Sequence, residues 1–321
     1  MAKIPYTKIR NEQVTVTMEI KNTIDTLNGF LKAGQILFDV PMSEHTTFKT
    51  GGIADIMVLP GTGEEVAASL KVLTQHAIPF LVIGKGSNLI VRDGGFRGAV
   101  VKLSDSFARI SVSHDTITAE SGASLAELVH TAHAHGLAGM EYAGGIPGSV
   151  GGAVVMNAGA YGGEMKDHVD TVNILDKDFN ILQMRAQELH FSYRSSALQK
   201  NGAIVLSSSF RLEKGDVQKA KERLNDLNRQ RREKQPLQYP SAGSVFKRPA
   251  GHFAGTLIEQ AGLKGFTIGG AQVSEKHTGF IINIGGASSS DILKLISHVQ
   301  KRVFEHSGVA LETEVKIAGE D

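Results

Sequence analysis

The sequence predicts an α+β protein assembled from small α/β lobes. Segments with the two-residue period of strands alternate with segments that have the 3.6-residue period of helices along most of the 321 residues. Apolar residues make up 41% of the chain and charged residues 21%, as in a globular protein with an ample core. Glycine is in excess, with 36 residues where roughly 22 would be average, and 20 of them lie between Gly51 and Gly163. That region is therefore expected to be rich in tight turns.

Residues 1–42 are predicted to form an N-terminal segment with one helix, because apolar residues recur at helical intervals over 18–33. The first lobe spans about 43–103. It combines a helix over 62–76, which Thr62 can cap, with strands over 51–60, 79–84 and 89–93.

A strand over 98–104 leads into the second lobe, which spans about 104–215. Ser124 and Glu127 have the spacing of a reciprocal capping box at the start of a helix, and Gly136 marks its end. The other predicted strands of this lobe cover 107–113, 115–120, 171–176, 180–184 and 203–212.

A separate C-terminal unit is predicted over 216–321. It opens with a helix over 216–235 that carries seven Lys/Arg and four Asp/Glu. A solvated helix that joins two domains is favoured over a nucleic-acid-binding arm, because the net charge of the chain is only +1. The remaining pieces are a loop over 236–250, helices over 253–261 and 288–306, and strands over 278–284 and 309–317.

Composition excludes several classes of protein. With no Cys, the chain has no disulfide, no Cys-ligated zinc, no Fe–S cluster and no Cys nucleophile. No signal-peptide core occurs in residues 1–20 and no apolar run reaches the roughly 18 residues of a membrane span, so we expect a cytoplasmic protein without a membrane or nucleic-acid partner. His130, His133 and His135 share a predicted helix without a convergent acid, so they are expected at solvated positions and no metal site is predicted.

The segment 84–88, Gly-Lys-Gly-Ser-Asn, looks like a nucleotide-binding loop. It fits neither a Walker A nor a Rossmann fingerprint, because a strand rather than a helix follows it. Two interpretations stay open. A nest of outward-facing backbone N–H groups would bind phosphate oxygens. An ordinary hairpin turn would need only the positive φ that glycine tolerates.

Residues 143–164 interleave glycines with small apolar side chains. Glycine lets the backbone approach a bulky partner closely, and Ser149 and Asn157 would fix polar groups there. Such a loop suits a large aromatic cofactor and its pyrophosphate. A flexible linker is disfavoured, because linkers are rarely as apolar as Ile146, Val150 and Met156 make this segment.

Three further segments carry candidate chemistry beside a plain structural alternative. Arg194, which follows Tyr193, would clamp a carboxylate or would be an ordinary surface cation. Residues 239–249 form a Ser/Gly turn surrounded by cations, or a solvated loop. For the strand predicted over 311–317, one interpretation is that a glutamate is buried. The alternative is that its glutamates line a solvent-exposed edge of the strand.

Taken together, seven ordered motifs resemble those of the UDP-N-acetylenolpyruvoylglucosamine reductase (MurB) family. Each motif alone is weak, but all seven in this order are very specific, and they span about residues 43–317. They are HTTFKTGG (45–52), IGKGSNLIVRDGGFRG (83–98), GGIPGSVGGAVVMNAGAYGGE (144–164), FSYRSS (191–196), PSAGSVFKRP (240–249), LIEQAGLKGFTIGGAQVSEKHTGFIIN (257–283) and LETEV (311–315).

The resemblance implies a two-lobed FAD-binding domain of the vanillyl-alcohol-oxidase (PCMH) type over 43–215, followed by a substrate domain over 216–321. It implies an FAD-dependent oxidoreductase of peptidoglycan precursor synthesis, and so a role in cell wall biogenesis, cell shape and cell division. NADPH would reduce the FAD and leave, after which the enolpyruvyl ether of UDP-GlcNAc would be reduced to UDP-N-acetylmuramate. The chain is similar to the form of the family that lacks an inserted Tyr-bearing loop over the substrate.

The motif matches imply a catalytic trio of Arg194, Ser244 and Glu314. A hydride from flavin N5 to C3 of the enolpyruvyl group would leave negative charge at C2 and on the carboxylate, which Arg194 would stabilise. Ser244 would protonate C2, and Glu314 would help to polarise the carboxyl system, with the protonated form as one option. The implied substrate contacts are Tyr193, Lys234 and His277. The implied cofactor contacts are Gly84, Lys85, Gly86, Ser87, Asn88, Ala143, Gly145, Ile146, Pro147, Ser149, Gly152, Asn157 and Gly159.

Two rival functions remain at this point. A different oxidoreductase on the same FAD scaffold, such as an alcohol oxidase, would be active without a sugar nucleotide. A nucleotide-sugar binding protein that has lost catalysis would keep the fold, although the presence of the whole trio argues against it. The colour of the purified protein separates a flavoenzyme from the second rival.

Overall fold

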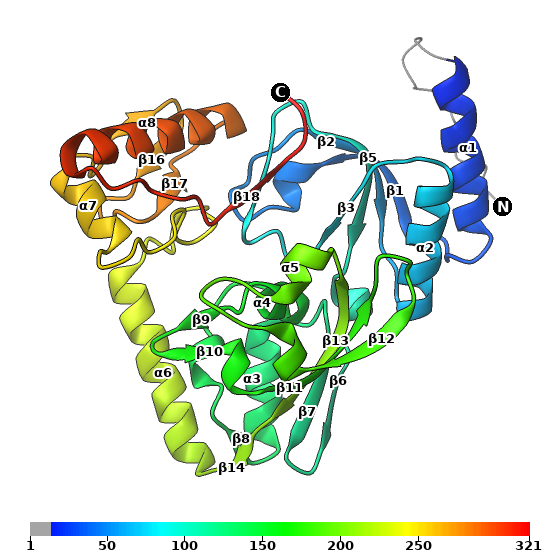
Figure 1. Ribbon diagram of the computed structural model, residues 1–321, viewed down its shortest axis with the longest axis horizontal. Coiled ribbons are helices and arrows are strands. Elements are labelled where there is room, and N and C mark those ends of the chain that lie inside the picture. The colour runs from blue at the N-terminus through cyan, green and yellow to red at the C-terminus, as the bar shows by residue number, and fades with distance from the viewer. Residues whose placement is uncertain (1–13) are drawn as a thin grey trace.

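The structure is a computed structural model that describes residues 14–321, with side chains from residue 20 onward. The predicted N-terminal segment 1–42 therefore lies partly outside the described residues. Figure 1 shows two lobes and a C-terminal unit, with the long helix α6 (Val217–Lys234) running along one side of the second lobe toward that unit. The site described below lies where these three parts meet.

The first lobe is a four-stranded sheet packed against two helices. Its strands follow the order β1 (Ile36–Pro41), β2 (Ile53–Val58), β5 (Phe96–Lys102) and β3 (Phe80–Ile83), and β1 is the antiparallel member. The helices are α1 (Val14–Asn28) and α2 (Gly63–Gln75). Thr62 caps α2 as predicted, whereas α1 begins and ends earlier than the predicted 18–33, with Gly29 directly after it.

The strand after the glycine turn does not return to β3. Instead β4 (Leu89–Val91) pairs in parallel with β18 (Lys316–Ala318), so the hairpin interpretation of residues 84–88 is wrong. The strand predicted over 309–317 is also mostly wrong, since only an isolated bridge of Thr313 to Phe246 precedes β18. Leu311 and Val315 of this segment are buried in the core, but the backbone that carries them is irregular. Their spacing in the sequence therefore resembled that of a strand.

The second lobe is a five-stranded antiparallel sheet. Its order is β12 (Ile181–Arg185), β11 (Val169–Leu175), β13 (Ile204–Arg211), β7 (Thr116–Glu120) and β6 (Ile110–Ser113). The capping box of Ser124 and Glu127 starts α3, as predicted. The tract 143–164, predicted as a loop, contains a short helix, α4. The lobe's other elements are α3 (Leu125–Ala134), α4 (Val150–Val155), α5 (Ala197–Asn201), β8 (Leu137–Ala138), β9 (Gly159–Ala160), β10 (Gly163–Glu164) and β14 (Glu213–Lys214).

The charged helix α6 is not wholly solvated. Asp216 caps its N-terminus, and Ala220, Leu224 and Leu227 are buried on one side. Because Leu224 and Leu227 belong to the core of the second lobe, α6 is part of that lobe's packing as well as a connection. The C-terminal unit after it consists of α7 (Ala254–Gln260), β15 (Thr267–Ile268), β16 (Ala271–Val273), β17 (Ile281–Asn283) and α8 (Ser289–Ser307).

Polar contacts attach the C-terminal unit to the first lobe. Asn283 Nδ2 donates to the carbonyl of Phe48 at 3.0 Å, and the Asp93 carboxylate accepts from the N–H groups of Ser289 and Ser290 at 2.8 and 2.9 Å. The second contact places a negative charge at the N-terminus of α8, where the helix dipole favours it. The unit is thus held at both the β4–β18 pair and the start of α8.

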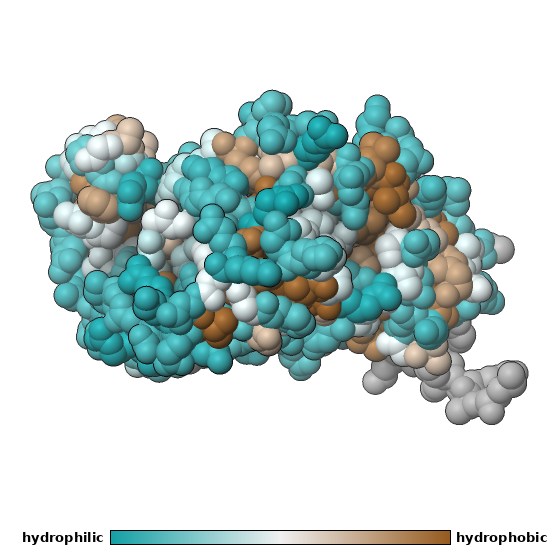
Figure 2. Space-filling model, turned by 90° about the horizontal axis from the view of Figure 1, so that it is seen from below, coloured by the Kyte–Doolittle hydropathy of each residue, from teal (hydrophilic) through white to brown (hydrophobic). Residues whose placement is uncertain are grey.

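Hydrophilic residues dominate the surface seen in Figure 2, and apolar residues form scattered groups between them. Within residues 14–321, no helix combines the length and the apolar character needed to cross a bilayer.

Replacing Asn283 by Ala should destabilise the protein. The Asn283 side chain is buried, and its Oδ1 also accepts from the N–H groups of Gly285 and Ala287 at 2.9 and 3.2 Å. The substitution leaves buried polar groups unpaired, so we expect a loss of about 1–3 kcal/mol of unfolding free energy, measured by chemical denaturation. The exposed Gln183→Ala should change it by less than about 0.5 kcal/mol. Equal stability of the two variants would contradict a stabilising role for the Asn283 hydrogen bonds.

Candidate functional site

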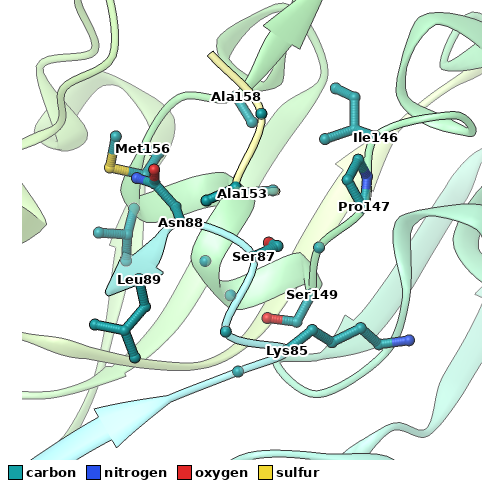
Figure 3. Close-up of a pocket in the computed structure, with 18 of the residues that line it drawn as sticks. Lys85, Ser87, Asn88, Leu89, Ile146, Pro147, Ser149, Ala153, Met156 and Ala158 are labelled. Carbon is teal, nitrogen blue, oxygen red and sulfur yellow. The ribbon is translucent and has the colours of Figure 1, made fainter. Parts of the chain in front are cut away.

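A cavity of about 510 Å³ lies between the two lobes and the C-terminal unit, within the range of cofactor sites. Its walls come from the turn after β3, from the start of α4 and from the strand ends of β9 and β13. Figure 3 shows Lys85 and Ser87 of the turn near Ser149, and Asn88 beside Met156. Two segments that are about 60 residues apart in sequence therefore form one wall.

The turn at 84–88 has the properties of an anion-binding nest. Gly84 packs against Ser149, whose hydroxyl a Cβ at residue 84 would overlap. Gly86 has a φ of +63° and leaves no room for a Cβ against the carbonyl of His45. None of the backbone N–H groups from 84 to 88 donates a hydrogen bond within the described chain. Free N–H groups in such a turn suit phosphate oxygens, so these residues fit a pyrophosphate.

Most of the predicted cofactor residues line this first cavity. They are Gly84, Lys85, Gly86, Ser87, Asn88, Ile146, Pro147, Ser149, Gly152 and Gly159.

Three of the predicted cofactor residues do not line it. Ala143 is fully buried in the core of the second lobe. Gly145 faces Asn228 and Arg231 of α6. Asn157 is also fully buried, and its side-chain amide donates to Glu164 at 2.9 Å and to the carbonyl of Ser192 at 3.0 Å. Its role in this structure is to hold the backbone around β9.

A second cavity, of about 470 Å³, lies beside the first on the C-terminal unit. Tyr193 and His277 line it, as expected for substrate contacts, and so do the cations Arg248, Lys264 and Lys276. Lys234 lines neither cavity and is exposed at the end of α6. Burial lowers the pKa of His277, whose Nδ1 accepts from the N–H of Gly279 at 3.2 Å. This imidazole is therefore neutral near pH 7.

Arg194, Ser244 and Glu314 are the three residues whose side chains or backbone line both cavities. Arg194 Nε donates to Glu314 Oε1 at 2.8 Å, and its Nη2 donates to the carbonyl of Gly159 at 3.1 Å. The Ser244 hydroxyl makes no hydrogen bond with a described residue, so its proton is available. The structure thus brings together residues from the second lobe and the C-terminal unit.

The electrostatics of this junction follow from burial. Removal from water raises the pKa of the Glu314 carboxyl, and the Arg194 guanidinium acts in the opposite direction. Arg194 has a positive φ of 52° and its guanidinium lies 5.2 Å from the centre of the Tyr193 ring. A cation fixed by a carboxylate, a carbonyl and an aromatic face can stabilise negative charge on a carboxylate ligand that enters the second cavity.

A residue of α6 and its C-cap residue, neither of which the sequence singled out, also line the first cavity. Arg231 and Gln235 reach its wall, although the charged helix looked solvated. Nothing in their residue types or spacing distinguishes them from the other polar residues of this helix.

The expectation for the histidines needs a correction. His133 is buried, and its Nε2 lies 3.1 Å from Glu141 Oε1 because α3 packs against the turn that carries this acid. Within the part of the chain that the structure describes, no group of three His, Cys, Asp or Glu residues is placed to hold a metal ion.

Comparison with known proteins bears on both parts of the chain. A family model described as an FAD binding domain matches residues 54–185, and the model of the C-terminal domain of UDP-N-acetylenolpyruvoylglucosamine reductase matches residues 235–318. These matches confirm an FAD-binding domain followed by a reductase domain of mixed α and β structure.

Relatives agree over nearly the whole chain. The UDP-N-acetylenolpyruvoylglucosamine reductase of Caldanaerobacter subterraneus subsp. tengcongensis is 52% identical over 297 residues, which are 92% of this chain and 98% of the relative. That of Clostridium botulinum (strain Hall) is 50% identical over 303 residues, or 94% and 99% of the two chains. The crystal structure of the reductase (MurB) from Thermus caldophilus superposes with a TM-score of 0.75 at 34% identity, covering 88% and 97%. The chain therefore belongs to the UDP-N-acetylenolpyruvoylglucosamine reductase family of FAD-dependent oxidoreductases.

Proposed function

We propose that the chain reduces the enolpyruvyl ether of UDP-GlcNAc to UDP-N-acetylmuramate with electrons from NADPH, in the cytoplasmic synthesis of peptidoglycan precursors. The observation that supports this most is the position of Arg194, Ser244 and Glu314 at the junction of an apolar cofactor cavity and a cationic second cavity. Bound FAD supplies the hydride that is added to the enolpyruvyl double bond. The chain's own residues manage the charge and the proton.

Arg194 stabilises the negative charge that develops on the enolpyruvyl carboxylate and at C2. Its guanidinium is held before the substrate arrives, by Glu314 and by the carbonyl of Gly159. Preorganised charges of this kind need no rearrangement during the reaction and are often the largest catalytic contribution. Glu314 acts as the partner that positions Arg194.

Ser244 donates the proton to C2. A serine hydroxyl is a weak acid, so it serves only a strongly basic carbon held beside it. The residue lies in both cavities, and its hydroxyl has no acceptor in the described chain that would compete for the proton. Ser244 would therefore supply the proton at the boundary between the two cavities.

The second cavity suits a sugar nucleotide diphosphate. Arg248, Lys264 and Lys276 line it, and Glu259 and Glu275 are the acids among its walls besides Glu314. The Tyr193 hydroxyl accepts from the backbone N–H of Arg248 at 3.3 Å, which fixes the ring at the wall. We include Tyr193 and His277 among the substrate contacts and leave out Lys234, which lies outside the cavity.

The primary experiment is spectroscopic. The purified protein should be yellow and, with oxygen excluded, should lose its flavin absorbance with NADPH and regain it only when the UDP-linked enolpyruvyl ether is added. Reduction of the oxidised flavin by a simple alcohol, without any sugar nucleotide, would favour a different oxidoreductase. A colourless protein that FAD cannot reconstitute would exclude the proposed function.

Replacing Gly84 by Ala should weaken FAD binding. The new Cβ would overlap the Ser149 hydroxyl and displace one wall of the nest. We expect the dissociation constant of FAD to rise about tenfold or more, equivalent to ~1.4 kcal/mol, by titration of the apoprotein. Gly61→Ala is the matched control, because a Cβ at residue 61 meets only ordinary contacts at 3.6 Å. Unchanged FAD affinity in the Gly84 variant would remove the turn from the cofactor site.

Replacing Ser244 by Ala should separate the two half-reactions. NADPH should still bleach the flavin at a normal rate, whereas reoxidation by the enolpyruvyl substrate should slow by about a hundredfold or more, as expected for loss of a general acid. Stopped-flow absorbance measures both steps. Ser241→Ala, three residues earlier, should leave both rates unchanged. Normal substrate reduction by the Ser244 variant would contradict the role of Ser244 as proton donor.

Glu314→Gln should lower turnover and alter its pH dependence. Burial raises the pKa of Glu314 above the ordinary value of 4.5. As the pH falls, the carboxylate that positions Arg194 is therefore protonated at a higher pH than an ordinary glutamate. The wild type should lose activity through an acidic limb above pH 4.5, and the Gln variant should lack this limb. Glu312→Gln, at an exposed carboxylate, should retain it. An unaltered pH profile in the Glu314 variant would exclude the positioning role.

A further inference from the structure

Helix α6 contributes a polar pair to the first cavity that the proposed mechanism does not use. Arg231 lies in the last turn of α6 and Gln235 is its C-cap residue, so the two side chains are one helical turn apart on the same side. Both line the first cavity and neither lines the second.

Neither side chain is satisfied within the protein. Arg231 Nε and Gln235 Oε1 are buried, and no described residue forms a hydrogen bond with either atom. Arg229, on the exposed part of the same helix, pairs with Asp226 and Glu233. No carboxylate among the described side chains forms an ion pair with Arg231, and burial lowers the pKa of its guanidinium. An unpaired buried donor and acceptor are costly, which indicates a partner that completes them.

Arg231 lies near the short strand β9, which also contacts Arg194. Its side chain packs against Gly145, where a Cβ would meet Arg231 at 3.4 Å. It also interacts electrostatically with Tyr161, which directly follows β9. Gly159, at the start of β9, is the residue whose carbonyl holds Arg194. Arg231, Arg194 and the short strand β9 thus line the same cavity.

We propose that Arg231 and Gln235 bind the imide edge of the flavin ring, with Gln235 accepting from the ring N–H and Arg231 donating to the neighbouring carbonyl. An unmatched donor beside an unmatched acceptor is the complement of that edge. The inference depends on one part of the proposed function, namely that FAD binds in the first cavity. A uracil ring carries the same imide edge, but both side chains line the cavity with the phosphate nest and neither lines the substrate cavity.

A positive charge at this edge also changes the chemistry of the cofactor. Reduction places negative charge on the pyrimidine part of the flavin ring, and a nearby guanidinium stabilises the reduced form. Arg231 would therefore raise the reduction potential of the bound flavin, in addition to orienting it.

The first experiment measures the two-electron reduction potential of the holoenzyme against a reference dye. Arg231→Gln should shift the equilibrium toward oxidised flavin by about tenfold or more, a fall of about 30 mV. Arg231→Lys, which keeps the charge but not the planar fork, should fall between this variant and the wild type. Arg229→Gln removes a charge from the exposed part of the same helix and should match the wild type.

The second experiment compares two cofactors, first in the wild type and then in two variants. Apoprotein is reconstituted with FAD or with an FAD analogue methylated at the ring N3, which cannot donate to Gln235. The wild type should bind the analogue at least about tenfold more weakly than FAD. Gln235→Leu should bind the two cofactors with equal affinity, and the control Gln230→Leu should discriminate between them as the wild type does.

The outcomes separate this inference from the proposed function. Wild-type potential in Arg231→Gln, or equal affinity of the wild type for FAD and its N3-methyl analogue, overturns the inference alone. Weaker binding of UMP to Arg231→Gln with an unchanged flavin potential assigns the pair to uracil and also overturns it. Failure of the wild type to bind FAD at all would overturn the proposed function as well.

Discussion

The ion pair between Arg194 and Glu314 is the interaction on which the arrangement of the site depends. Its partners are 120 residues apart in sequence, one from the second lobe and one from the C-terminal segment that leads into β18. Neither charge would be tolerated here alone, because each is withdrawn from water. The pair therefore fixes how the C-terminal segment lies against the lobe. It also leaves the remaining guanidinium donors facing the boundary of two cavities.

Much of the fold was predictable where local signals agree with packing. The Ser124–Glu127 capping box, the Thr62 cap and the antiparallel strands of the second lobe all follow from residue type and spacing. The errors occur where tertiary contacts decide. The strand predicted over 309–317 failed because its apolar residues enter the core from an irregular segment, and β4 pairs with a strand more than 220 residues away. No local pattern encodes such a partner.

The site was predictable in outline. Glycine at 84 and 86 pointed to a tight, donor-rich turn, and the structure explains each by a neighbour that excludes a Cβ. Asn157 shows the limit, because a polar residue in a glycine tract is predicted as a ligand contact, and the sequence does not reveal that its amide donates to Glu164 and to the Ser192 carbonyl. Arg231 shows the opposite case. Among seven cations of one helix, nothing in the sequence marks the one that packing turns inward.

The pairing of β18 with β4 has a consequence for the order of assembly. Residues 316–318 lie more than 220 residues after their partners at 89–91, which adjoin the turn that forms the phosphate nest. The lobes can gain their own cores earlier, but this contact closes a very long loop and must wait until residues 316–318 have been synthesised. A growing chain in which only the two lobes have folded would accordingly carry an incomplete cofactor cradle. Synthesis of this late strand, rather than folding of either lobe, would then set the moment at which the protein becomes able to retain its flavin.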